Sequence, residues 1–487
     1  MYVTLRGAPA QPAPPPRPEQ DIWGDPVLRR ATDLDLSAEP GIGPGPVPEQ
    51  TSDPGVRAEP VGEQVVPTAG NPKGRKIAST VVALGVVSLL TDVSSESVSA
   101  ILPLYITAVL GMSPLAYGFI DGIYQGVSAL VRMLGGWWAD SSRRPKWVAF
   151  TGYAGSAAAR IAMLFTTSFA GITGVVTIDR LGKGLRTGPR DALIATAAPP
   201  DQLGHNFGVH RALDTTGALA GPLLAFAVLA LIPVGLGGYR SVFALSAAFA
   251  IVGVVVLALA VPNLRTASEP ADRVAARTAS RAAWRDLARP ELRRLVLAAG
   301  VLGLLTVGDG FLYLALAQSG NFGAQYFPLL FVGTNAAYLA LAVPLGRLAD
   351  RVGRAKVFIA GHVVLLTAYL VALSALPDLA RVFTTLVLLG TFYACTDGVL
   401  AALASRTVPE AARSRGISAA QTAVALARFG ASVAFGVLWQ FTGQSTALLV
   451  MALGLAVVIP LAAWLLRPRS TAPVRSSEPG HDTGGTA

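Results

Sequence analysis

The chain has 487 residues, of which 52% are hydrophobic and only 14% are charged, and its formal net charge is +10. A soluble globular domain carries about 25% charged residues, so this composition excludes an ordinary soluble enzyme and indicates an integral membrane protein. One cysteine, Cys395, excludes intrachain disulfides, and four scattered histidines predict no metal or other cofactor. Because the basic residues are dispersed over many loops, we expect no nucleic-acid partner.

Residues 1–76 are rich in Pro, Gly, Ala and Glu and contain the runs PAPPPRP and PGIGPGPVP. Low hydrophobicity with much Pro and Gly predicts a disordered tail, which by the orientation argued below is cytoplasmic. The tail lacks the basic-then-apolar pattern of a cleavable signal, so we expect the first membrane helix to direct insertion. Residues 468–487 have a similar composition and are also predicted to be disordered.

Between these tails, twelve stretches are long and apolar enough for a membrane helix, which takes about 20 residues. They lie at 79–109, 114–138, 147–167, 170–198, 206–234, 239–261, 294–318, 324–346, 355–376, 381–405, 412–439 and 444–466. The less apolar connection 262–293 separates residues 77–261 from residues 294–467. The predicted fold is therefore an all-α membrane protein with twelve transmembrane helices in two six-helix bundles.

The orientation follows from the distribution of Lys and Arg, because basic loops stay in the cytoplasm. The connections that follow the second, sixth, eighth and tenth stretches are basic, whereas 110–113 and 319–323 carry no charge. Both termini and the linker 262–293 are therefore predicted to be cytoplasmic. For the whole chain we expect a multi-pass protein of the plasma (inner) membrane.

The two halves contain one segment twice. GWWADSSRRPK at 136–146 aligns with GRLADRVGRAK at 346–356, each just after the second apolar stretch of its half. Parallel six-helix repeats are typical of major facilitator superfamily transporters, and both segments resemble the loop motif that follows the second helix of each half in that superfamily. The resemblance implies breakable gating contacts between the halves, made by Asp140, Arg144, Asp350 and Arg354. The alternative interpretation is that the basic residues only fix the topology.

The fourth stretch carries an unusual run of charges, IDRLGKGLRTGPRD at 178–191. An ionised side chain at membrane depth costs several kcal/mol, so such groups either pair with one another or face a water-filled path. Helical spacing predicts one face with Asp179, Lys183, Arg186 and Arg190, and a neighbouring face with Arg180 and Asp191. We call these six charged side chains the charge ladder, and we predict that they line the pathway of a polar cargo.

Three glycines and Pro189 interrupt the same ladder, so the fourth helix is expected to be either closely packed or locally broken. Acids on other stretches are available as counter-charges for its surplus of bases: Asp92 and Glu96 on the first, and Asp214 beside His210 and Arg211 on the fifth. The fourth stretch, with these residues, resembles a bacterial branch of the superfamily whose fourth helix reads Asp-Arg-x-Gly-Lys-Gly-x-Arg and continues Pro-Arg-Asp-Ala-Leu. The resemblance implies that the first, fourth and fifth helices adjoin the cavity.

Two interpretations of this charge network stay open. Either every charge is permanently paired, or some carboxyl exchanges partners between states and thereby releases its proton on one side and collects it on the other. The favoured proton sites are Asp92 and Glu96, followed by Asp121 and Asp214. In the second half, Asp309 and Asp397 either face the cavity and select a cationic or hydroxyl-bearing cargo or make helix-packing hydrogen bonds.

The fifth stretch contains Gly217, Gly221 and Pro222 in a Gly-x-x-x-Gly-Pro pattern. It resembles the motif of superfamily members that export cargo in exchange for protons. Small residues four apart also allow two membrane helices to pack closely. The pattern therefore fits an exporter and a helix-packing device equally well.

No phosphate-binding loop or nucleophile motif occurs, so we expect no enzyme. The sequence favours a secondary active transporter that moves a small organic molecule by alternating access, with proton-coupled efflux as the first interpretation. The alternatives are proton-coupled or facilitated uptake of a polar solute, a lipid or amphiphile flippase, and a membrane scaffold without transport. The expected partners are a small-molecule substrate, protons and membrane lipid, and the protein is expected to be a monomer.

Overall fold

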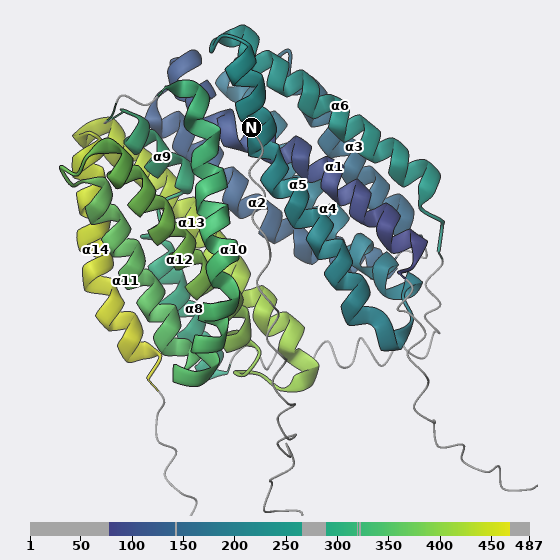
Figure 1. The fold of residues 1–487 in the computed structure, drawn as a ribbon. Coiled ribbons are helices and arrows are strands. Elements are labelled where there is room, and N and C mark those ends of the chain that lie inside the picture. The colour runs from purple at the N-terminus through teal and green to yellow at the C-terminus, as the bar shows by residue number, and fades with distance from the viewer. Residues whose placement is uncertain (1–76, 142–143, 265–288, 319, 321–322, 468–487) are drawn as a thin grey trace, which may run out of the picture. The chain divides into compact units, whose positions relative to one another are not determined.

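The computed structural model describes residues 77–141, 144–264, 289–318, 320 and 323–467 (Figure 1). The predicted tails and most of the predicted linker lie outside the described residues. Within these ranges every regular element is helical, and no strand occurs.

The helices follow the predicted stretches closely. In the first half they are α1 (Ser79–Leu104), which continues into the π-helical turn η2 (Tyr105–Val109), α2 (Pro114–Ser141), α3 (Pro145–Met163), α4 (Phe169–Ala197), η3 (Pro200–Gln202), α5 (Leu203–Leu231) and α6 (Leu236–Ala260). In the second half they are α8 (Pro290–Gly303), α9 (Asp309–Gln318), η4 (Ala324–Tyr326), α10 (Phe327–Val352), α11 (Arg354–Ala372), α12 (Asp378–Ala404), η5 (Glu410–Ala412), α13 (Arg413–Thr442) and α14 (Gln444–Leu465).

Eight helical segments of the described residues are long and apolar enough to cross a membrane. The helix α4 is not among them, because its six charged side chains lower its hydropathy. The helices α8 and α9 are too short individually, with 14 and 10 residues where a crossing takes about 20. The protein is thus a multi-pass membrane protein, and the number of twelve crossings stays a prediction.

The same helix pairs pack in each half. In the first half α1 lies beside α5 and α6, and α3 lies beside α4 and α6 (Figure 1). In the second half α8 packs on α13 and α14, and α11 packs on α12 and α14. The halves touch mainly through α2 with α13 and α5 with α10, which are equivalent pairs under the repeat. The sequence repeat therefore corresponds to a repeat of packing.

The seventh predicted stretch is broken between α8 and α9. Polar backbone groups inside a membrane need partners within the protein. Here the hydroxyl of Tyr369 on α11 accepts a hydrogen bond from the Val307 N–H at 2.8 Å and donates one to the Leu305 carbonyl at 3.1 Å. The break is thereby stabilised. It places Gly308 so close to the Asp121 carboxyl on α2 that a side chain there would collide with it.

The fourth stretch, by contrast, is one continuous helix. Its glycines serve close packing: a Cβ added to Gly182 would collide with the Gly152 carbonyl and the Ser156 hydroxyl of α3. Of the two possibilities that the sequence left open for this helix, the structure has the closely packed one.

Candidate functional site

The most deeply buried part of the α4 ladder is centred on Asp179. Its carboxylate lies 2.8 Å from the Arg160 guanidinium of α3, and it also accepts hydrogen bonds from its neighbour Arg180, one of them at 3.0 Å from Nε. The three side chains are 3–7% exposed. Arg180 further stacks on Tyr124 of α2, with 3.9 Å from its guanidinium carbon to the ring centroid. This cluster joins three helices of the first half and is shielded from solvent.

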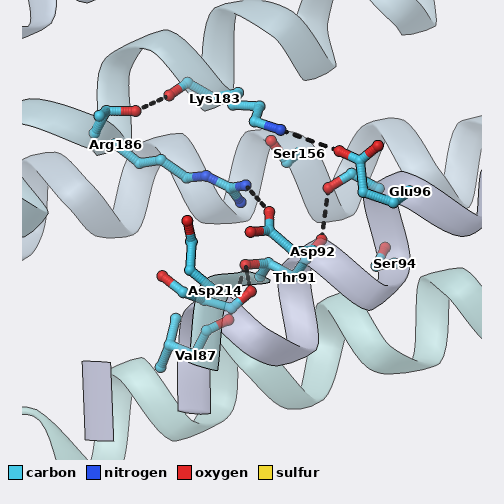
Figure 2. Close-up of polar contacts among 12 residues, drawn as sticks. Val87, Thr91, Asp92, Ser94, Glu96, Ser156, Lys183, Arg186 and Asp214 are labelled. Carbon is cyan, nitrogen blue, oxygen red and sulfur yellow. Dashed lines mark hydrogen bonds and ion pairs between the residues drawn. The ribbon is translucent and has the colours of Figure 1, made fainter. Parts of the chain in front are cut away.

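The next rungs of the ladder contact α1 (Figure 2). The Lys183 ammonium lies 3.2 Å from the Glu96 carboxylate, and the two side chains are 34% and 26% exposed. The Arg186 guanidinium lies 3.6 Å from the Asp92 carboxylate, in a much more enclosed setting. Lys183 and Glu96 therefore form the ion pair of α4 and α1 that is most accessible to water.

The last rung, Arg190, connects α4 with α1 and α5. Its guanidinium lies 3.1 Å from Asp191 and 3.4 Å from Asp214, and it donates a hydrogen bond to the Ser88 hydroxyl at 3.3 Å. Asp214 also pairs with the exposed Arg211 at 3.4 Å. The Asp92 and Asp214 carboxyl groups lie close to one another. The structure thus gathers most of the sequence-predicted charges of α1, α4 and α5 into one network.

Two predicted site residues of the first half, His210 and Asp121, do not join this network by hydrogen bonds. His210 is buried, and neither of its ring nitrogens has a hydrogen-bond partner among the described residues. Asp121 lies elsewhere, on α2, where its carboxylate accepts a 2.6 Å hydrogen bond from the Ser432 hydroxyl of α13. Asp121 therefore links the two halves.

The second half contributes a smaller polar cluster. Asp309, the first residue of α9, accepts a 2.6 Å hydrogen bond from the Tyr393 hydroxyl of α12. Asp397 lies one turn further along α12, and its carboxylate has no hydrogen bond or ion pair within the described ranges. Arg428 of α13 lies over the Tyr393 ring at 5.6 Å and supplies the positive charge that faces both acids.

Sequence reasoning missed Arg428. It is an isolated charge in the middle of the apolar stretch 412–439, where an unpaired guanidinium is costly. The argument that identified the fourth stretch applies equally to this residue, so its position alone was a sufficient signal.

Two adjoining cavities lie between these clusters. The first, of about 190 Å³, is lined from the first half by Glu96, Ser99, Leu102, Pro103, Tyr117, Asp121, Tyr124 and Gln125, and from the second by Asp309, Gly310, Phe331 and Asn335. The second, of about 210 Å³, is lined by Asp309, Tyr313, Phe331, Thr334, Asn335, Tyr338, Tyr393 and Asp397. The two adjoin at their shared lining residues Asp309, Phe331 and Asn335, and we refer to them together as the central cavity.

A third cavity of about 270 Å³ shares Tyr338 with the central cavity and extends to Asp350 and Arg354. These two predicted gating residues pair with each other at 2.8 Å, and Arg354 also donates to the Ala402 carbonyl of α12 at 3.1 Å. Both contacts lie within the second half. In the first half, Arg144 is exposed, and the side chain of Asp140 lies outside the described residues.

The Gly-x-x-x-Gly-Pro pattern of α5 packs against α1. A Cβ on Gly217 would collide with the backbone of Leu89, and one on Gly221 would lie 2.8 Å from the Ser97 nitrogen and 2.9 Å from the Glu96 Cβ. Pro222 lies inside the continuous helix. The motif thus brings α5 directly behind the Glu96 side of the central cavity.

Comparison with known proteins agrees with this architecture. The Major Facilitator Superfamily profile matches residues 84–329 and 304–484. An uncharacterised MFS-type transporter of Methanocaldococcus jannaschii is 27% identical over 387 residues, which cover 77% of this chain and 92% of the relative. An uncharacterised protein of Mycobacterium tuberculosis is 34% identical over 159 residues, or 31% of this chain and 37% of the relative.

Solved structures show the same fold at low sequence identity. A mutant of the nucleoside transporter NupG has a TM-score of 0.67 at 14% identity, covering 80% of this chain and all of the other. A bacterial homologue of the human lysosomal transporter Spinster, in an inward-facing and unoccupied conformation, has a TM-score of 0.61 at 16% identity, covering 81% and 95%. With the family profile matched over both halves, the chain belongs to the major facilitator superfamily of transporters.

Proposed function

We propose that the protein is a proton-coupled secondary transporter that exports a small organic molecule across the plasma (inner) membrane by alternating access. The observation that carries this proposal is the composition of the central cavity, to which Glu96 and Asp121 contribute from the first half and Asp309 and Asn335 from the second. A site shared by two halves changes its access when the halves rock against each other. Residues 77–261 and 294–467 are the proposed moving bodies.

The contacts between the halves support an inward-open state. The start of α2 packs on the end of α13, where a Cβ on Gly436 would lie 2.9 Å from the Pro114 carbonyl. Phe226 near the end of α5 stacks on Tyr326 of η4, with ring centroids 5.9 Å apart. These ends are external in the proposed orientation, in which both termini are cytoplasmic. The cavity that reaches Asp350 then leads from the central cavity toward the cytoplasm.

In this state the proposed gating contacts of Asp350 and Arg354 remain within their own half. We propose that they exchange partners across the halves, together with Asp140 and Arg144, when the cytoplasmic side closes. Such an exchange would stabilise the outward-open state, as the superfamily loop motif implies.

Proton coupling is assigned first to Glu96 and Asp92. Glu96 lines the central cavity and pairs with the partly exposed Lys183, so a change in hydration of the cavity when the halves rock can weaken this ion pair. A carboxylate that loses its cationic partner in a poorly hydrated site takes up a proton. Asp121 and Asp214 are the next candidates, because Asp121 bridges the halves and Asp214 adjoins Asp92.

The direction of transport rests on the resemblance of Gly217 to Pro222 to the exporter motif. The remaining charges of the network, from Asp179 to Asp191, and the pair His210 and Arg211 are proposed to shape the pathway around α1. We further propose that the protein acts as a monomer among membrane lipids.

A screen in inside-out vesicles tests the proposal. Exported cargo should accumulate inside such vesicles when their lumen is acid, and the addition of cargo should discharge the pH gradient. Protein-free vesicles serve as the control. Accumulation that persists after the gradient is collapsed would contradict proton coupling, and accumulation only in right-side-out vesicles would indicate uptake. Movement of a labelled lipid, with no soluble cargo moved, would indicate a flippase.

A further inference from the structure

The charged lining of the central cavity has one sign. Among the described residues, its lining includes Glu96, Asp121, Asp309 and Asp397 and no Lys, Arg or His. Lys183, which is not itself a lining residue, pairs with Glu96 and neutralises it. Arg428 faces Asp309 and Asp397 across the Tyr393 ring. The four acids outnumber these two bases, so the cavity has an excess of negative charge when all the carboxyls are ionised. Such an excess at membrane depth needs protons or a cationic ligand.

The same cavity has aromatic walls. Its rings are Tyr117, Tyr124, Phe331, Tyr313, Tyr338 and Tyr393. The faces of such rings attract a cation at distances up to about 6 Å, and their apolar bodies cover a flat organic group. Carboxylates and aromatic faces together therefore match a molecule that has a positive charge and an apolar ring.

Two polar side chains in the cavity wall have no protein partner. Tyr117 is only 3% exposed, yet its hydroxyl makes no hydrogen bond within the described part of the chain. Asp397 also lacks a hydrogen bond or ion pair there. Buried polar groups are normally satisfied, so the unpaired hydroxyl of the buried Tyr117 indicates a ligand that supplies the missing contact. The Asp397 carboxylate is exposed to the cavity and is therefore open to pairing with the same ligand. An ammonium group with several N–H donors can make both contacts.

On the basis of the proposed transport function, we propose that the cargo is an organic cation, specifically an amine attached to an aromatic or other flat apolar group. The ammonium lies near Asp309 and Asp397, and the apolar group lies between the tyrosines and Phe331. Asn335, which lines both parts of the cavity, is placed to accept or donate a further hydrogen bond.

Calorimetric titration of the purified full-length protein in detergent tests this assignment with three indole probes. Tryptamine carries the ammonium, tryptophol replaces it with a neutral hydroxyl, and indole-3-acetate replaces it with a carboxylate. Tyramine serves as a second amine. We expect both amines to bind, tryptophol to bind at least about tenfold more weakly than tryptamine, and indole-3-acetate not to bind. Binding of indole-3-acetate as tight as that of tryptamine, or no binding by either amine, would overturn the proposal.

Two variants locate the site. Asp309→Asn and Asp397→Asn should each raise the Kd of tryptamine by at least about tenfold, because each removes a charge-assisted contact. Asp397 has no hydrogen bond within the described residues to lose, so its variant tests binding without disturbing the fold. Asp378→Asn, at the start of α12 and outside the cavity lining, is the matched control and should bind as the wild type does. Unchanged tryptamine binding in both cavity variants would refute the assignment.

This test is independent of the coupling mechanism, because binding in detergent requires no gradient. If tryptamine binds as expected but vesicles fail to accumulate it with an acid lumen, the cation site stands and proton-coupled export is wrong. If the vesicles export a neutral or anionic cargo and no amine binds, export stands and the cation site is wrong.

Discussion

Replacement of Asp92 by Asn together with Glu96 by Gln is expected to abolish cargo accumulation driven by an imposed pH gradient, while downhill exchange of cargo continues. The two carboxyls lie one turn apart on α1 and face Arg186 and Lys183 of α4. Their amide counterparts keep a similar shape and cannot exchange protons. Gradient-driven accumulation in vesicles should fall to the level of protein-free vesicles, since no proton then moves in exchange for the cargo.

The control for this double variant is Glu410→Gln, which removes a carboxylate that is 86% exposed and outside the network. It should accumulate cargo at the wild-type rate. Full gradient-driven accumulation by the α1 double variant would show that the coupling protons travel elsewhere, with Asp121 and Asp214 as the next positions to replace.

The second large effect concerns folding. Asp179→Asn is expected to destabilise the protein by about 3–5 kcal/mol, because the guanidiniums of Arg160 and Arg180 stay buried while the carboxylate that they share is lost. Thermal unfolding in detergent, together with the yield of monodisperse protein, measures this effect. The variant should unfold at a markedly lower temperature than the wild type.

Asp350→Asn is the matched control, because Asp350 also pairs with an arginine but is 61% exposed. A pair at such an exposed position contributes at most about 1 kcal/mol, so the control variant should unfold close to the wild type. An Asp179→Asn protein that is as stable as this control but no longer transports cargo would reassign Asp179 from the scaffold to the transport pathway.

Much of the fold was predictable because membrane helices are specified locally. Each needs a long apolar stretch, and the chain has twelve of them with basic loops between alternate pairs. The broken seventh stretch was not predictable in this way. Leu305, Thr306 and Val307 read as a continuation of an apolar helix, and the Tyr369 hydroxyl that stabilises the break comes from a helix more than 60 residues away.

The residues of the candidate site were predictable from the sequence, but the contacts between them were not. Helical spacing placed Asp179 on the same face as Lys183, yet Asp179 contacts Arg160 of α3 whereas Lys183 contacts Glu96 of α1. Likewise Asp121 and its partner Ser432 are 311 residues apart and belong to different halves. Such pairings depend on how helices are placed in space, which periodicity along one helix does not contain.

The central claim, that the cavity opens to one side of the membrane at a time, is tested most directly by thiol accessibility. Cys395 is the single cysteine, so Cys395→Ser with Asn335→Cys gives one reporter thiol in the central cavity. A membrane-impermeant maleimide is applied from either side, before and after a short cross-linker joins cysteines placed at Phe226 and Tyr326, and only the label on the peptide that contains position 335 is counted. We predict that the cross-link abolishes labelling from outside and transport, and that labelling from the cytoplasm continues. External labelling that persists in the cross-linked protein would contradict the account.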